Sequence, residues 1–132
     1  MLKLTKKTEY ALMALRHIQL TGKDNIVSAR EISELYRIPF PLLAKIMQEL
    51  ARKKIVTPIQ GPRGGYLLRA DLEQMSLRQF FETMEGPLGV MDCYYDSNCE
   101  IAEKCNIRSP IQHINESVRN MLDNMTVYEV TK

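Results

Sequence analysis

Residues 28–68 constrain the fold most, because they combine two short helices, a proline-containing turn between them and a glycine-rich hairpin. Ser28 and Glu31 form the S-x-x-E pattern of a capping box, which predicts that a helix begins at the next residue. Pro39 predicts its end, since proline disfavours the helical conformation of the residue before it. Pro41 suits the first turn of a second helix, where its missing N–H costs nothing.

The second predicted helix has an apolar face and a polar face. Lys45, Gln48 and Arg52 fall on the polar side, as expected for a solvated surface or for a helix that enters the DNA major groove. The apolar side chains recur at spacings of three and four, which predicts a buried face: Leu42, Leu43, Ile46, Met47 and Leu50.

A glycine-rich hairpin follows this helix. Residues 56–60 and 66–68 are predicted strands around a turn at 61–65, where glycines permit a tight bend and close approach of a partner. Arg63 at the tip can enter a minor groove or contact phosphate. A helix-turn-helix followed by a basic hairpin is a winged helix, which predicts DNA binding. The residues expected to contact DNA are Ser28, Arg30, Pro41, Lys45, Gln48, Arg52, Gln60, Arg63 and Gly64, with Arg30 and Arg52 as phosphate contacts.

The whole chain of 132 residues predicts one mainly α domain with a small β-wing. It has no apolar run of transmembrane length and no signal peptide, so we expect a cytoplasmic protein without a membrane partner. Residues 1–75 hold 13 Lys/Arg and 7 Asp/Glu, whereas residues 76–132 hold 5 and 9, as expected when one face lies on nucleic acid. No catalytic Ser/His/Asp set, phosphate-binding loop or acid pair is present, so an enzyme is not expected.

The remaining segments predict helices over 5–20 and 77–84, a short strand at 26–27 that pairs with the wing, and a return of residues 126–130 to the first helix. The first helix is apolar on more than one side, so we expect it to lie between the DNA-binding unit and another layer. His17 on this helix is interpreted as a packed or hydrogen-bonded residue rather than a ligand.

All three cysteines lie in residues 87–109, a segment without helical or strand periodicity. Cys93, Cys99 and Cys105 are evenly separated by five residues, which indicates a metal site rather than a disulfide framework. Zinc usually takes closer C-x2–4-C pairs. An iron–sulfur cluster accepts thiolates on loops and a fourth ligand of another kind. Cluster, zinc and free or redox-active thiols remain alternatives on spacing alone.

The C-terminal helix, predicted from Pro110, carries an apolar seam at alternating three- and four-residue spacings. Such a seam suits packing within the domain or a coiled-coil-like contact with another helix. Its members are Ile111, Ile114, Val118, Met121 and Met125. We therefore divide the chain into residues 1–86 for DNA binding, 87–109 for the cysteine segment, and 110–132 for the final helix and tail.

Three stretches, LTKKTEYALMALRHI, IPFPLLAKIMQELARKKIV and the wing GPRGGYLL, resemble the Rrf-two family of bacterial transcription regulators, including its cluster-binding IscR-like and NsrR-like branches. The resemblance covers nearly the whole chain, and GPxGGYxL is its most specific motif. It implies a homodimer on double-stranded operator DNA, with the C-terminal helix as the dimerisation helix. Family members often carry Arg where Gln60 stands, so Arg63 is a candidate substitute in the minor groove.

The resemblance also implies an iron–sulfur cluster on the three cysteines, either 2Fe–2S or 4Fe–4S. IscR-like proteins have a histidine three residues after the third cysteine, but Arg108 stands there and cannot ligate. NsrR-like proteins use a carboxylate on the first helix of the other subunit, and Glu9 occupies that place. Its alternative role is an acid placed favourably at the start of a helix.

Two other functions remain possible from sequence. The chain could sense through its cysteine thiols or a small ligand without a cluster. It could also be a winged-helix module that binds a protein partner instead of DNA.

Overall fold

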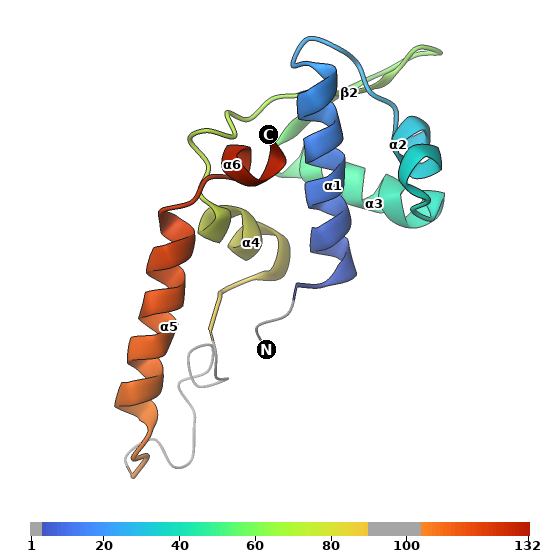
Figure 1. Ribbon diagram of the computed structural model, residues 1–132. Coiled ribbons are helices and arrows are strands. Elements are labelled where there is room, and N and C mark those ends of the chain that lie inside the picture. The colour runs from blue at the N-terminus through green and yellow to red at the C-terminus, as the bar shows by residue number, and fades with distance from the viewer. Residues whose placement is uncertain (1–3, 90–103) are drawn as a thin grey trace.

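The computed structural model describes residues 4–89 and 104–132 (Figure 1). Its elements in chain order are α1 (Lys6–Thr21), α2 (Ala29–Tyr36), α3 (Phe40–Arg52), β1 (Val56–Ile59), β2 (Gly65–Leu68), α4 (Leu77–Glu85), α5 (Arg108–Asp123) and α6 (Val127–Thr131). The architecture is mainly helical with one two-stranded antiparallel sheet, as the sequence predicted. No helix within the described ranges is long and apolar enough to cross a membrane.

Helix α1 is the centre of the molecule. It contacts α3 and β2 on one side and α4 and α6 on the other (Figure 1). Ala11, Ala14, Leu15 and Ile18 are fully buried along one face of it, whereas the apolar side chains of Met13 and Leu20 are exposed. As predicted, α1 thus lies between two layers, with α3 and β2 on one side and α4 and α6 on the other.

Helices α2 and α3 begin and end close to the predicted positions. The Ser28 side chain accepts a hydrogen bond from the Glu31 backbone N–H and caps α2. At the C-terminal end of α2, Arg37 adopts a left-handed conformation with φ of 55°, which reverses the chain direction. Pro39 then directly precedes α3. Leu43, Ile46, Met47 and Leu50 are buried as predicted. The prediction for Leu42 was wrong: it is 37% exposed, because it lies in the first turn of α3, at the edge of the packed face.

The hairpin forms the predicted wing. β1 pairs with β2 so that Val56 lies opposite Leu68 and Ile59 lies opposite Gly65. Next to the turn, β1 ends one residue earlier and β2 begins one residue earlier than predicted. Val27 adds a bridge to Tyr66 through backbone hydrogen bonds of 3.0 and 2.8 Å, which confirms the predicted pairing of the short strand. A side chain at Gly64 would place Cβ only 2.3 Å from the carbonyl oxygen of Ile59. Glycine is therefore required in this turn.

The C-terminal part returns to α1. Helix α5 begins at Arg108, two residues earlier than predicted, and packs on α4. Helix α6 carries buried Val127 and Thr131, and Gln19 of α1 donates a 3.1 Å hydrogen bond to the Thr131 hydroxyl. This confirms the predicted return of residues 126–130 to the first helix.

Candidate nucleic-acid interface and cysteine segment

The surface predicted to contact DNA consists of α2, α3 and the wing, whose tip projects from the body in Figure 1. The side chains of Lys45, Gln48 and Arg52 are exposed on α3, opposite its buried face. Gln60 and Arg63 are exposed at the wing turn, and Gly64 is half-buried beneath it. The fold thus leaves the predicted basic and amide side chains accessible to a ligand on α3 and on the wing.

At the start of α3 an aromatic side chain positions one of the predicted phosphate contacts. The Arg30 guanidinium carbon lies 4.8 Å from the centroid of the exposed Phe40 ring. Such stacking holds the planar guanidinium while its edge can still donate to a phosphate. Pro41 follows on the exposed surface of the first turn. The sequence prediction did not include Phe40, although an exposed aromatic residue directly after a helix-ending proline is a recognisable signal.

Polar contacts join α1 to α2 and α3. Lys7 Nζ lies 3.3 Å from Glu49 Oε1 on α3. His17 Nε2 lies 2.7 Å from the Glu31 carboxylate, and His17 Nδ1 lies 2.9 Å from the Tyr36 hydroxyl, both on α2. The interpretation of His17 as a hydrogen-bonded helix residue is confirmed. The Glu31 carboxylate bonds to His17, so the capping pattern at Ser28 operates through the serine side chain.

The first turn of α1 holds Glu9, the proposed carboxylate ligand. Its Oε2 lies 3.1 Å from Lys6 Nζ, and the Glu9 side chain is 41% exposed. The hydrogen bond and charge of Glu9 raise the pKa of the Lys6 ammonium. Glu9 therefore has the dipole-favourable position that the sequence indicated. Its exposure also leaves the carboxylate accessible to a second molecule.

The start of α1 is tied to the end of α4. The Thr5 backbone N–H donates a 2.7 Å hydrogen bond to Glu85 Oε1. Partial burial alone would raise the pKa of Glu85, but hydrogen bonds from Thr5 and Thr8 and the charge of Lys7 together lower it. The chain passes from this junction through Gly86 into the cysteine segment.

The described residues contain one of the three predicted thiol ligands. Cys105 is a half-buried free thiol three residues before Arg108, the first residue of α5. Cys93 and Cys99 lie outside the described residues. Within residues 4–89 and 104–132, no three His, Cys, Asp or Glu side chains are grouped closely enough to hold a metal ion. His113 is exposed on α5.

Helix α5 turns polar residues toward its own domain. Asn115 is buried, Arg119 Nε donates a 3.0 Å bond to the Leu88 carbonyl, and Asp123 bonds to Arg78 of α4 at 2.8 Å. Within the described structure, Ile114 and Met121 remain 49% and 57% exposed. The other seam residues, Ile111, Val118 and Met125, are half-buried.

Comparison with known proteins agrees with this geometry. The sequence matches the Rrf2 family, described as an iron-dependent transcriptional regulator, over residues 4–132. An Aquifex aeolicus protein with the name of an HTH-type transcriptional regulator is 37% identical over 73 residues, covering 55% of this chain and 50% of that protein. The transcriptional regulator IscR of Vibrio campbellii is 25% identical over 131 residues, covering 99% of this chain and 78% of IscR.

Among solved structures, the fold is similar to that of CymR, the global cysteine regulator of B. subtilis. The TM-score is 0.74 at 22% identity, covering 99% of this chain and 97% of CymR. This likeness extends the winged-helix description to the whole fold, α5 and α6 included. The chain therefore belongs to the Rrf2 family, whose members are winged-helix transcription regulators and not enzymes.

Proposed function

We propose that this regulator binds operator DNA as a homodimer and responds to an iron–sulfur cluster held by Cys93, Cys99 and Cys105 with Glu9 of the partner subunit. One observation carries the proposal: three evenly spaced cysteines lie on the segment that connects α4 to α5 in a chain with the winged-helix fold. Residues 1–86 then form the DNA-binding unit, 87–109 the sensory segment and 110–132 the dimerisation helix and tail.

The donor set fits such a cluster. Cys105 is a free thiol next to α5, and the Glu9 carboxylate is partly exposed on α1. Within one chain the first turn of α5 lies far from α1 (Figure 1), so a site that uses both ligands requires two subunits. When bound, a cluster supplies an iron centre sensitive to redox state and nitric oxide. A carboxylate oxygen is a harder and weaker ligand to iron than a thiolate. The iron atom bound by Glu9 would therefore be the one that exchanges its ligand most easily.

The contacts around α1 offer a path from this site to DNA. Glu9 shares the beginning of α1 with Thr5, which bonds to Glu85 of α4, and with Lys7, which pairs with Glu49 of α3. Displacement of this turn would therefore alter the position of the recognition helix. Coupling between the sensory site and the operator requires the two states of the site to favour different helix positions, typically by about 1–3 kcal/mol.

The exposed seam of α5 supports dimerisation. Ile114 and Met121 leave large apolar side chains on the surface, while Asn115 is buried and Arg119 and Asp123 bond to residues of the same subunit. A helix from a second subunit would bury these side chains by two-fold symmetric packing. A two-fold dimer also matches a pseudo-palindromic operator read in successive major grooves.

The experiment that tests the sensory proposal is an absorption spectrum of anaerobically purified protein, with iron and acid-labile sulfide assays. We expect a brown protein with visible charge-transfer bands whose shape distinguishes 2Fe–2S from 4Fe–4S. The Glu9→Ala protein should retain iron but show altered bands. A colourless, iron-free protein after anaerobic reconstitution would contradict the cluster proposal and leave the DNA-binding assignment intact.

A second candidate is sensing through the thiols or through a small ligand without a cluster. The ion pair of Glu9 with Lys6 favours it, because ligation by Glu9 would break a contact already made within the subunit. This candidate predicts operator binding that depends on thiol oxidation in iron-free protein. Operator affinity unchanged between reduced and oxidised iron-free protein would exclude the thiol version.

A further inference from the structure

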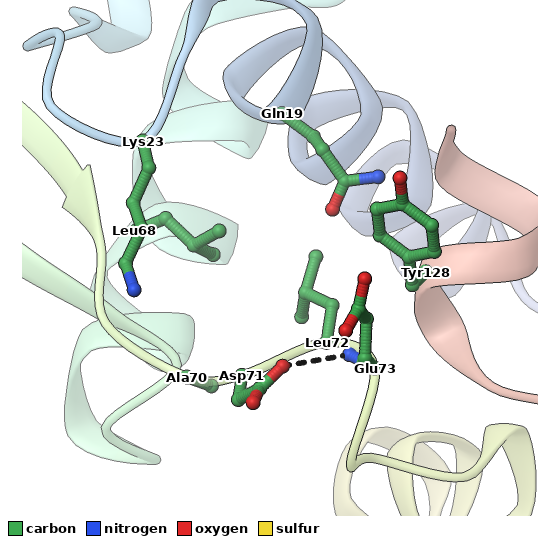
Figure 2. Close-up of a pocket in the computed structure, with 8 residues that line it drawn as sticks. All are labelled: Gln19, Lys23, Leu68, Ala70, Asp71, Leu72, Glu73 and Tyr128. Carbon is green, nitrogen blue, oxygen red and sulfur yellow. Dashed lines mark hydrogen bonds between the residues drawn. The ribbon is translucent and has the colours of Figure 1, made fainter.

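A hollow separates the end of α1 from the β2–α4 linker and from α6 (Figure 2). Its volume is about 340 Å³, which lies within the range of about 300–1,000 Å³ typical of small-molecule sites. Eight residues line it: Gln19, Lys23, Leu68, Ala70, Asp71, Leu72, Glu73 and Tyr128. The hollow involves no cysteine and no predicted DNA contact, so it is separate from both sites described above.

The walls of the hollow carry opposite charges. Lys23 follows α1 on one wall, and Asp71 and Glu73 lie on the linker. None of these three side chains takes part in an ion pair within the described part of the chain. In Figure 2 the Lys23 amine and the Glu73 carboxylate lie on opposite sides of Leu72. A ligand with two opposite charges could therefore reach both.

The floor between these charges is apolar. Leu72 is 2% exposed and belongs to the hydrophobic core, and Leu68 packs against that core. Apolar lining with a few placed polar groups is the usual composition of a small-molecule site. The arrangement thus provides an apolar surface for the side chain of a ligand that carries both charges.

Local hydrogen bonds hold the linker turn and the Gln19 side chain in place. The Asp71 carboxylate accepts a 3.0 Å bond from the Glu73 backbone N–H and fixes the linker turn (Figure 2). The Gln19 amide nitrogen donates to Thr131 of α6, so its oxygen remains as an acceptor, and Figure 2 shows that oxygen turned toward the hollow. The linker turn and the Gln19 amide are therefore positioned before any ligand enters.

We propose that this hollow binds a small zwitterion of the free α-amino acid class. Its carboxylate pairs with Lys23, and its ammonium group pairs with Glu73 and the Gln19 amide oxygen. Its side chain lies on Leu68 and Leu72. Binding brings the turn after α1 toward the linker.

The position of the hollow connects it to the wing and to α6. Leu68 ends strand β2, while the Tyr128 backbone N–H bonds to the Leu72 carbonyl at 3.0 Å. A ligand that holds Lys23 against this linker favours one arrangement of α1 relative to the wing. By linkage, operator DNA and the zwitterion then alter each other's affinity by the same factor. This coupling rests on the proposed operator binding. The binding of the zwitterion in the hollow is independent of that proposal.

The test is calorimetric titration of the full chain, without DNA, by each standard amino acid separately. We expect at least one to bind, and expect its amide and its N-acetyl derivative, which each lack one charge, to bind more weakly. Lys23→Met and Glu73→Gln should each weaken binding about tenfold, the effect of losing one charged hydrogen bond. Lys104→Met and Glu116→Gln, which change exposed residues outside the hollow, should leave affinity unchanged.

Two results would overturn the proposal. One is no binding heat from any standard amino acid at millimolar concentration. The other is binding that neither Lys23→Met nor Glu73→Gln weakens, with circular dichroism showing both variants folded. Operator affinity measured with and without the bound amino acid tests the coupling: an equal affinity excludes it. A protein that binds the amino acid but no DNA would contradict the proposed operator binding alone.

Discussion

The His17 imidazole bridges the two ends of α2: Nε2 lies 2.7 Å from the Glu31 carboxylate and Nδ1 lies 2.9 Å from the Tyr36 hydroxyl. Glu31 is in the first turn of α2 and Tyr36 is its last residue. The His17 and Tyr36 rings also meet edge to face, with centroids 5.4 Å apart. One side chain of α1 therefore contacts α2 near both of its ends.

Replacement of this histidine should destabilise the domain. His17→Phe keeps a ring but removes both hydrogen bonds, so we expect a loss of about 1–3 kcal/mol in the free energy of unfolding. Urea denaturation followed by circular dichroism measures it. His113→Phe, at the exposed histidine on α5, is the matched control and should change stability little. Equal stabilities for the two variants would contradict the bridging role.

The Glu85 carboxylate predicts a pH dependence. Its pKa is lower in the folded chain than its ordinary value of 4.5, because hydrogen bonds from Thr5 and Thr8 and the charge of Lys7 outweigh the opposing effect of burial. The stabilising contribution is therefore complete above pH 4.5 and is lost as the pH falls through the folded pKa. Glu85→Gln should lower the melting temperature at pH 7, and the difference from wild type should shrink below pH 4.5. A difference independent of pH would exclude this ionisation as its source.

Gly64 should not tolerate a side chain. Gly64→Ala places Cβ 2.3 Å from the Ile59 carbonyl oxygen, so β1 and the turn must separate. We expect a loss of stability of about 2 kcal/mol, typical of a strained backbone substitution, and weaker DNA binding. Pro62→Ala, in the same exposed turn, serves as control and should be close to wild type in unfolding experiments. Normal stability of the Gly64→Ala protein would show that the turn can rearrange at little cost.

Arg63 at the wing tip should contribute to DNA affinity. Fluorescence anisotropy measures DNA affinity across a salt series, using a duplex selected from random sequence and an unrelated duplex. The Arg63→Ala protein is compared with wild type and with Lys132→Ala, which serves as the control. Loss of one phosphate contact should reduce the salt slope by about 1 and weaken selected and unrelated DNA equally. A loss confined to the selected duplex would identify Arg63 as a base reader. Affinity insensitive to salt in the wild type would favour the protein-partner alternative.

The seam of α5 should control assembly. Ile114→Glu and Met121→Glu each place a charge on the exposed apolar face, where a partner helix would have to bury it. We expect sedimentation equilibrium to show monomers for these variants and dimers for wild type. Gln112→Glu, on the exposed polar side of the same helix, should remain dimeric. A wild-type monomer at all concentrations would contradict the proposed dimerisation.

Sequence alone predicted the order and type of the elements from α1 to α5, because each carries a local signal; helix α6, capped by Thr126, was predicted only as a returning segment. Ser28 and Ser76 cap α2 and α4 through backbone N–H groups three residues later, as their spacing indicated. The glycines of the wing predicted a tight turn. The structure shows why glycine is needed at position 64, where a Cβ would clash with the Ile59 carbonyl oxygen. Such features depend on neighbours within a few residues, which is why they can be read without a fold.

Long-range contacts escaped prediction. The stacking of Arg30 on Phe40 depends on how α2 meets α3, and the bridge from His17 to Tyr36 depends on how α1 crosses α2. The sequence left open which side of α5 packs on its own domain; in the structure Asn115 is buried and Arg119 bonds to Leu88, whereas Ile114 and Met121 are exposed. Amphipathic periodicity indicates that a helix has two faces, but the neighbouring elements decide which one they cover.

Sequence by itself determined the helix-turn-helix, the wing, the positions of the cysteines and the family to which the chain belongs. Only the tertiary structure placed Lys23 opposite Glu73 around an apolar floor, and only it left Ile114 and Met121 exposed on α5. The physical reason is the range of the interactions. Caps, turns and periodic faces form between residues close in the chain, whereas a hollow or an open face results from packing between segments far apart in it.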